Sequence, residues 1–420
     1  MNLRGRTVPV WLMGLTNATF GMYGGMVSIS LPEILAEQHI PEARIAIITA
    51  TAMTPAFWAF LICPMLDVRF TRRVYATASS IFAAVLLCLG LLNLHHLFLL
   101  EVLLTLGFAG ACITQNALGG WLSTTIHHED ESRLSAWFNV SNISGGGIIA
   151  TFTLTLIHRL PLPLAAVLLS VALLLPLSIY PFIPVTPPDA RLARESFSAF
   201  FRDILSLLKR REILIALALF LAPSGSFALT NILGGLGQDF HASTRVIALA
   251  GGAGVTVAGI CGSLVFPLLA RRMSLRPLYL TIGILGACFT LSLLLLPRSP
   301  AVYALSMIGE NIFQSLAITG SFAIAFETIG QHNPLAATTF SVIGAASNLP
   351  IFYMEIIDGR GYTWHGVTGS FLADATLGLL ACTLLLLLLR LIRRPSTGVL
   401  SPLPLAADAA CSTTGATPSD

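Results

Sequence analysis

Charged residues are scarce in this chain. Of its 420 residues, 10% are charged and 55% are hydrophobic, and the mean hydropathy is +0.82. Soluble domains carry about 25% charged residues, so a water-soluble fold could not bury this much apolar surface. The formal net charge of +3 is too small to indicate a nucleic-acid partner. The composition therefore predicts an integral membrane protein in contact with lipid.

Signs of metal, redox or catalytic chemistry are also lacking. The 7 cysteines have no paired or metal-type spacing, and all but Cys411 lie in or beside apolar runs, so we interpret them as packing residues. The acidic turn from His127 to Glu131 resembles a metal cluster, but adjacent residues on a short loop rarely converge on one ion. No Ser/His/Asp or Cys/His arrangement stands out. We expect no catalytic residue, no metal site and no cofactor.

The apolar runs lack the two-residue alternation of β-barrel strands, and they are long enough for helices. About 20 apolar residues cross the hydrocarbon core of a bilayer as a helix. The first run is too long for a signal peptide and lacks a small-x-small cleavage site, so we expect it to be retained. The sequence predicts an all-α integral membrane protein with 12 transmembrane helices, at about 8–31, 43–66, 74–94, 97–122, 134–157, 162–183, 212–233, 244–269, 277–297, 300–326, 336–358 and 367–390.

An internal repeat predicts two halves of six helices each. The segment from Pro64 to Arg73 reads Pro-x-Leu-x-x-Arg-x-Thr-x-Arg, and Pro267 to Arg276 repeats it 203 residues later with Ser for Thr. A second echo pairs Ser141-Asn142 with Ser347-Asn348. The predicted units are an N-terminal half (1–183), a cytoplasmic linker with an amphipathic helix (184–211), a C-terminal half (212–394) and a disordered cytoplasmic tail (395–420).

The basic loop residues indicate orientation. Most loop arginines fall on the side that would also hold both termini, and cytoplasmic loops carry the excess of positive charge. We therefore expect both termini to be cytoplasmic. The predicted location is the cytoplasmic (inner) membrane of a bacterium, and we expect a monomer.

The loop Pro-Met-Leu-Asp-Val-Arg-Phe-Thr-Arg-Arg resembles the signature of the major facilitator superfamily, Gly-x-x-x-Asp-Arg-x-Gly-Arg-Arg, although both family glycines are missing. The resemblance implies two six-helix halves that rock about a central site. It also implies an inner-gate role for Asp67, with Arg69 and Arg73 as its partners. In the second copy Arg272 and Arg276 would act, but Ala270 stands where the acid should be, so the latch would be one-sided. The arginines could instead serve only to orient the loops.

A second resemblance concerns the eleventh predicted span. Ala337 to Ser341, Ser347 to Pro350 and Asp358 to Gly361 are similar to the peptide/acetyl-coenzyme A/drug branch of the superfamily, which includes AmpG-like muropeptide permeases. This similarity implies a muropeptide-like or other amphipathic substrate.

Two acids lie well inside predicted spans. A carboxylate at membrane depth costs a few kcal/mol, so it is usually paired, protonated or facing water. Glu310 is our first candidate for carrying a proton and Asp374 the second; the alternative is that Glu310 faces the wet end of a cavity and couples nothing. Asp358 is expected to pair with Arg360 at the surface.

The implied fold places the first, fourth, seventh and tenth spans around the central cavity. No arginine or lysine lies inside these spans, which favours a neutral or amphipathic solute. The candidate substrate-binding residues are Asn17, Tyr23, Gln115, Asn231, Asn311, Gln314 and Asn348.

The sequence thus predicts a secondary transporter, proton-coupled, for a small organic solute. A drug or metabolite efflux carrier working as a proton antiporter is the alternative, because residues do not reveal the direction of transport. A membrane-embedded acyltransferase would need a catalytic side chain at a membrane face, where His127 and His128 are the available pair.

Overall fold

A computed structural model describes residues 8–185, 202, 205–206, 209–225, 228–331 and 333–393. Over these residues the chain forms helices joined by short turns, without a strand. The predicted linker helix lies mostly outside the described residues, and the predicted tail of 395–420 lies outside them entirely. The helices are α1 (Val10–Leu15), α2 (Ala18–Gly25), α3 (Leu31–Glu37), α4 (Glu42–Met53), α5 (Pro55–Trp58), α6 (Arg72–Leu92), α7 (Leu97–Ser123), α8 (Glu131–Arg159), α9 (Leu162–Leu174), α11 (Arg211–Phe220), α12 (Ala228–Gly235), α13 (Thr244–Ala248), α14 (Val255–Ala270), α15 (Leu275–Leu293), α16 (Pro300–Ile329) and α17 (Ala336–Arg393).

Within the described ranges, 9 helical stretches are long and apolar enough to cross a membrane. The last of them, α17, contains His365 and Gly366 with non-helical backbone angles, and Gly366 has a φ of 59°. Here the chain turns back, so α17 consists of a first arm (336–364) and a second arm (367–393), which match the eleventh and twelfth predicted spans. The first and seventh predicted spans are interrupted, at Thr16–Asn17 between α1 and α2 and between α11 and α12.

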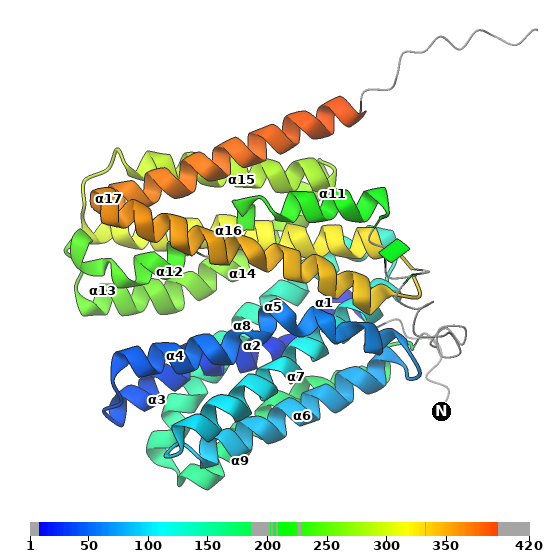
Figure 1. Cartoon of the computed structure of the whole chain (residues 1–420), viewed down its shortest axis with the longest axis vertical. Helices are drawn as coiled ribbons and strands as arrows, with labels where there is room; N and C mark the ends of the chain where they lie inside the picture. The colour runs from blue at the N-terminus through cyan, green and yellow to red at the C-terminus, as the bar shows by residue number, and fades with distance from the viewer. Residues whose placement is uncertain are drawn as a thin grey trace, which may run out of the picture.

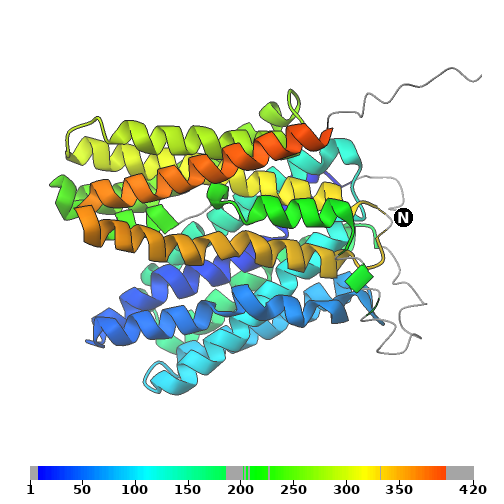
Figure 2. The same ribbon diagram turned by 45° about the horizontal axis from the view of Figure 1, so that its top comes forward.

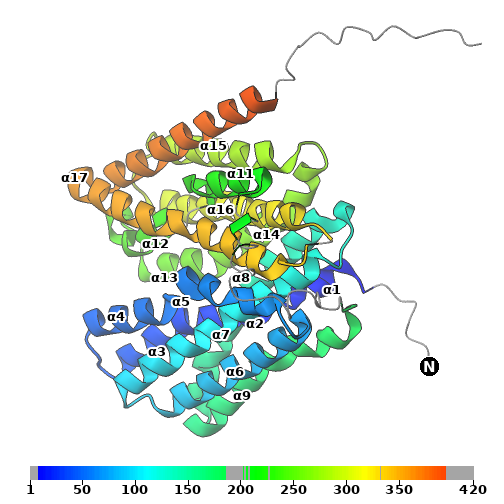
Figure 3. The same cartoon turned by 45° about the vertical axis from the view of Figure 1, so that its right-hand side comes forward.

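The helices form two groups, which lie in the lower and upper parts of Figure 1 and keep this order in Figures 2 and 3. In the first group, α1 to α9, α6 packs on α7 and α2 packs on α8. In the second group, α11 to α17, α14 packs on α16, and α15 packs on both α16 and α17. The groups meet where α8 contacts α14 and α16, and where α7 contacts α17.

Two glycines allow the tight packing of α2 on α8. A Cβ atom on Gly21 would lie 2.1 Å from the carbonyl oxygen of Asn142, and one on Gly25 would lie 2.5 Å from the Cα atom of Gly146. The four-residue spacing places both glycines on one face of α2. Their lack of side chains therefore lets the backbones of α2 and α8 approach closely.

Candidate functional site

A cavity of about 150 Å³ lies between the two groups of helices. Residues of α2, α5, α7 and α8 line one side, and residues of α15, α16 and α17 line the other. None of the described lining residues is charged. The hydrogen-bonding side chains are Gln115, Asn116, Asn142, Tyr279, Ser321, Ser341, Ser347 and Asn348, and the phenyl rings are Phe20, Phe60, Phe322 and Phe340.

Of the predicted substrate-binding residues, Gln115 and Asn348 line this cavity. The echo between the halves also leads there, because Asn142 of α8 and Asn348 of α17 occupy matching places and both face the cavity. The Asn348 side-chain amide donates to the Ala56 carbonyl across the groups at 3.2 Å. The repeat was therefore a usable signal for Asn142, which the list of candidates omitted.

Asn17 and Tyr23 lie inside the first group and away from the cavity. The Asn17 amide donates to the Phe138 carbonyl at 3.2 Å, and the Tyr23 hydroxyl donates to the Leu104 carbonyl at 3.3 Å. Both side chains are fully buried. Their observed contacts join helices of one group.

The other three candidates lie in the second group. The Gln314 side-chain oxygen accepts a hydrogen bond from the Thr230 hydroxyl at 2.9 Å. The exposed Asn231 amide donates to the Glu355 carboxylate at 2.8 Å. Asn311 is buried and donates to the backbone of its own helix. The first two contacts tie α12 to α16 and to the first arm of α17.

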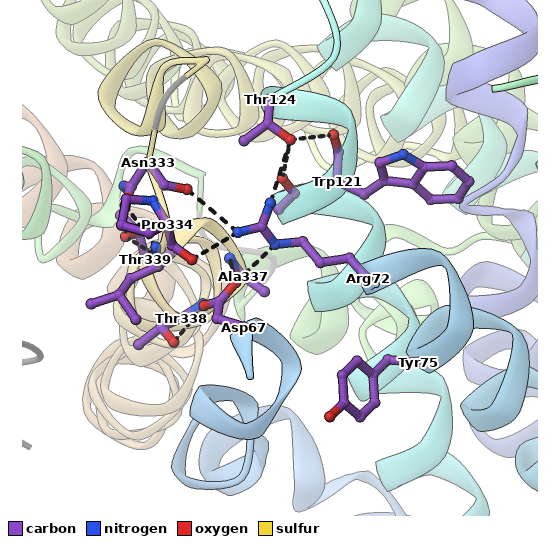
Figure 4. A network of polar contacts seen from close by, with 12 residues as sticks. Asp67, Arg72, Tyr75, Trp121, Thr124, Asn333, Pro334, Ala337, Thr338 and Thr339 are labelled. Carbon is purple, nitrogen blue, oxygen red and sulfur yellow. Dashed lines mark hydrogen bonds and ion pairs between the residues drawn. The ribbon is translucent and has the colours of Figure 1, made fainter. Parts of the chain in front are cut away.

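Asp67 joins the two groups at one end of the molecule (Figure 4). Its carboxylate is buried, with the residue 2% exposed. Oδ1 accepts from the backbone N–H of Ala337 at 3.1 Å, and Oδ2 accepts from the backbone N–H and the hydroxyl of Thr338 at 2.8 and 2.7 Å. These N–H groups belong to the first turn of α17, where they have no partner within the helix and the helix dipole favours a negative charge. An acid of the first group thus caps a helix of the second.

Arg72, the first residue of α6, is the arginine that pairs with Asp67. Its Nε atom lies 2.8 Å from Oδ1 of Asp67, and its Nη2 atom donates to the Pro334 carbonyl at 2.9 Å, just before α17. The predicted pairing with Arg69 and Arg73 is wrong. Successive side chains of a helix point about 100° apart, so Arg73 is turned away from the acid that Arg72 faces, and Arg69 is exposed.

The second copy of the loop has no equivalent contact. Ala270 ends α14 where the acid would stand, and Arg272 is exposed. The Nε atom of Arg276 is buried without a hydrogen-bond partner. Neither arginine forms an ion pair within the described ranges.

Close packing reinforces the Asp67 contact. A Cβ atom on Gly120 would lie 2.4 Å from the backbone nitrogen of Ala337, so glycine lets α7 approach the start of α17. Deeper in the bundle, the ring of Phe138 in α8 meets the rings of Phe322 and Phe340, with centroids 5.1 and 6.1 Å away. Buried apolar contacts therefore extend inward from the Asp67 contact.

Further polar contacts between the first and second groups also lie on this side. The buried Asn139 amide donates to the hydroxyls of Ser263 and Thr319 at 2.9 and 3.3 Å. The Gln331 amide, in the turn before α17, donates to the Ile126 carbonyl at 2.7 Å. These bonds cross the boundary between the groups.

At the opposite end, the described polar side-chain contacts stay within one group. Arg44 pairs with Glu101 inside the first group, with 2.9 Å between nitrogen and oxygen. Arg298 donates to the Thr368 hydroxyl at 3.1 Å inside the second. The two groups are therefore fastened together at the Asp67 end, and no described side-chain hydrogen bond fastens them at the other.

Three acids occupy the interior of the second group. Glu310 is 5% exposed and accepts a hydrogen bond from the Thr290 hydroxyl at 2.5 Å. Asp374 is half-buried in the second arm of α17. The expected surface pair of Asp358 with Arg360 is wrong, because Asp358 is fully buried and neither of its carboxylate oxygens has a hydrogen-bond partner. Arg360, two residues further along the helix, is exposed.

The acidic turn before α8 holds an ion pair. The Nδ1 atom of His128 lies 2.9 Å from Oε2 of Glu131. Among the residues that the structure describes, no three His, Cys, Asp or Glu side chains are placed to bind a metal ion.

Comparison with known proteins agrees with this architecture. The family model of the Major Facilitator Superfamily matches residues 13–354, whereas no curated protein matches the chain. A fucose:proton symporter of E. coli, FucP, has a similar structure, with a TM-score of 0.69 and 13% identity over 90% of this chain and 98% of its own.

Two further solved structures are similar. The proton:xylose symporter XylE, bound to 6-bromo-6-deoxy-D-glucose, has a TM-score of 0.65 and 13% identity over 89% of this chain and 94% of its own. A bacterial homologue of the iron transporter ferroportin, in an outward-facing state, has a TM-score of 0.63 and 15% identity over 92% of this chain and 100% of its own. An acyltransferase function is therefore excluded. The chain belongs to the major facilitator superfamily and is a membrane transporter rather than an enzyme.

Proposed function

We propose that this transporter moves an uncharged, amphipathic organic solute and couples its movement to protons. The observation that carries the proposal is the cavity between the groups, which is lined by amides, hydroxyls and aromatic rings without a charged residue. A charged solute held there would leave its charge without an opposite charge or a full hydration shell, which is unfavourable in a buried site. A neutral solute with hydroxyl or amide groups can form hydrogen bonds with the lining side chains, so that neither partner is left with unpaired polar groups.

The class of solute follows from both kinds of lining group. Amides such as Gln115, Asn142 and Asn348 can hydrogen-bond hydroxyl and amide groups, while the phenyl rings offer apolar faces. A muropeptide-like molecule carries sugar hydroxyls and peptide amides that fit this lining. The free carboxylates of its peptide do not fit, so a neutral sugar-amide fragment is the expected form. The similarity of Ala337 to Ser341 and of Ser347 to Pro350 to the AmpG-like branch supports this class.

We propose that the Asp67 end faces the cytoplasm of a bacterium and that the protein works as a monomer in its inner membrane. The loop arginines gather at this end, as the positive-inside rule requires. Residues 1–183 and 212–394 would then be the two halves, with both termini cytoplasmic. In this orientation the described state has its inner gate closed, and Asp67 with Arg72 is the latch of that gate.

Proton coupling is assigned to Glu310 with Asp374. Glu310 is buried at membrane depth and is hydrogen-bonded by a neutral hydroxyl rather than by a cation. A carboxyl group in such a place serves a function that offsets the cost of burial. Proton binding is the function that a carboxyl without a basic partner can perform.

The test begins with a thermal-shift screen of the purified chain in detergent. The panel contains neutral sugars, muropeptide fragments and matched cationic and anionic compounds. Neutral amphipathic solutes should raise the melting temperature, and Asn142→Ala should reduce that rise. Asn93→Ala is the control, because the Asn93 amide donates to the Leu89 carbonyl of its own helix and does not line the cavity.

Solutes that bind are then followed in proteoliposomes with and without a pH gradient. Accumulation toward the alkaline side indicates symport, and expulsion in exchange for protons indicates the efflux alternative. Stabilisation by charged compounds alone would contradict an uncharged substrate. Flux that ignores the pH gradient would contradict proton coupling.

A further inference from the structure

Asp358 is the least satisfied acid in the described part of the chain. It lies in the first arm of α17, is fully buried, and neither Oδ1 nor Oδ2 has a hydrogen-bond partner. A buried carboxylate without a cation or a hydrogen-bond donor is strongly unfavourable, whereas the neutral acid is tolerated at a much lower cost. Asp358 therefore needs a partner that no described side chain supplies.

The other two buried acids are its neighbours. The Ser370 hydroxyl, one turn before Asp374, donates to the backbone carbonyl of Asp358 at 2.8 Å, so the two arms of α17 hold these acids close together. Each of the three acids lies within electrostatic range of the other two. Measured along the helices at about 1.5 Å per residue, they lie about 10 to 15 Å from the end opposite Asp67. Three helical segments, α16 and both arms of α17, thus bring one acid each to the same depth.

No basic side chain balances this group. Glu310, Asp358 and Asp374 form no ion pair with any described arginine, lysine or histidine. The remaining groups that act on Asp358 and Asp374 are Glu355 and the Tyr353 hydroxyl, neither of which is a cation. Glu355 is exposed and bonded by Asn231, and the Tyr353 hydroxyl donates to the Leu221 carbonyl at 2.6 Å.

We propose that Glu310, Asp358 and Asp374 together form a proton-binding site that holds at least one shared proton inside the second group of helices. Three negative charges without a cation repel one another in a dry site, and protonation relieves the repulsion. The assignment rests on the proposed proton coupling and adds Asp358 to it. None of the three acids lines the cavity, so the proton and the solute bind at separate places.

The hydrogen bonds of α12 connect this site to the rest of the carrier. Thr230 donates to Gln314, one turn from Glu310 on α16. Asn231 donates to Glu355, about one turn from Asp358 on α17. A change of charge on the acids therefore acts on the two helices that hold α12, which belongs to the interrupted seventh span. Through α12 the proton site can influence how the second group meets the first.

Infrared spectroscopy of the full-length chain in detergent, with the proton as the only ligand, tests the site. The wild type should show absorption by protonated carboxyl groups that disappears as the pH is raised. Asp358→Asn and Glu310→Gln should each remove part of this absorption. Glu42→Gln is the control and should leave it unchanged, because Glu42 is exposed at the start of α4 in the other group of helices.

Size-exclusion profiles confirm that each variant folds, and Asp374→Asn replaces either variant that does not. An absorption that is the same in the wild type and in every folded variant would overturn the proposal. The flux assay separates this outcome from a failure of the proposed function. Flux driven by pH with unchanged absorption refutes the acid site alone, while lost absorption without pH-driven flux refutes the coupling and leaves the site.

Discussion

The two copies of the repeated loop differ at the two positions that form the ion pair of the proposed latch. They share a proline, a leucine, a Ser/Thr and two arginines, which are Arg69 and Arg73 in the first copy. Asp67 corresponds to Ala270, and Arg72 corresponds to Leu275. The observed ion pair joins Asp67 to Arg72. The shared residues therefore mark the duplicated architecture, and the unshared residues carry the contact between the groups.

The helices α8 and α17 show the same asymmetry at their first turns. The first turn of α8 contains its own acid, Glu131. The first turn of α17 contains none and is capped by Asp67 from the other group. A helix that carries its own acid keeps it when the groups separate, whereas α17 loses its cap. In the proposed mechanism, the loop with the acid is therefore the one that regulates opening.

The largest expected effect is that of Asp67→Asn. Removing the buried charge breaks the pair with Arg72 and weakens the cap on α17, which should cost about 3 kcal/mol, or about 150-fold in the ratio of closed to open states. Cys63, which is fully buried beside the contact, reports opening through its rate of labelling by a water-soluble maleimide in a chain without the other cysteines. Asp130→Asn is the control, since Asp130 pairs with Arg133 three residues away at the surface. Equal labelling of both variants would contradict the latch.

Arg72→Ala should have the next largest effect. Asp67 would keep its bonds to Thr338 and Ala337 but lose its cation. We therefore expect the equilibrium between closed and open states to shift toward the open state by about 2 kcal/mol, which makes Cys63 labelling about 30-fold faster. Arg69→Ala and Arg73→Ala should each change the equilibrium by less than about 0.5 kcal/mol, because neither arginine reaches the acid. Labelling in Arg73→Ala as fast as in Arg72→Ala would show that the shared arginines carry the contact.

Gly120→Ala tests the packing beneath the latch. The new Cβ would fall 2.4 Å from the Ala337 nitrogen and force α7 away from α17, at a cost of about 1 to 2 kcal/mol. Cys63 labelling should therefore accelerate. The matched control is Gly234→Ala in α12, where no atom lies within 4 Å of the added Cβ and labelling should not change.

The smallest effect is expected from installing the missing pair in the second loop. Ala270→Asp combined with Leu275→Arg should shift the equilibrium by less than about 1 kcal/mol, because the first turn of α8 already holds Glu131. Cys63 labelling within about fivefold of the parent chain is the expected result. Slowing by more than tenfold would show that the two loops are interchangeable and that residue type alone makes a latch.

Much of the fold could be predicted because the relevant forces act locally along the chain. Runs of about 20 apolar residues must cross the bilayer as helices whatever they pack against. The repeat of the loop and of the Ser-Asn dipeptide indicated two halves. The asparagine of each Ser-Asn dipeptide, Asn142 in one and Asn348 in the other, lines the cavity. Gln115 lines the cavity because its predicted span does so.

Where the observed contacts differ from the expected ones, the physical cause is that helix rotation decides what a residue faces. Arg72 and Arg73 are adjacent in sequence but point about 100° apart, and only Arg72 reaches Asp67. Asp358 and Arg360 were expected to meet at the surface, but rotation along α17 buries one and exposes the other. Asn17 and Tyr23 are polar residues of a predicted cavity helix whose observed contacts join helices within the first group.

The sequence by itself determined that this chain is a set of membrane-crossing helices with few charges, because hydrophobic length and composition are properties of single segments. The tertiary structure alone decided that Asp67 caps a helix some 270 positions away and that three acids from three helical segments meet without a cation. Such contacts depend on how separate helices rotate and pack against one another, and that arrangement is specified jointly by residues far apart in the chain.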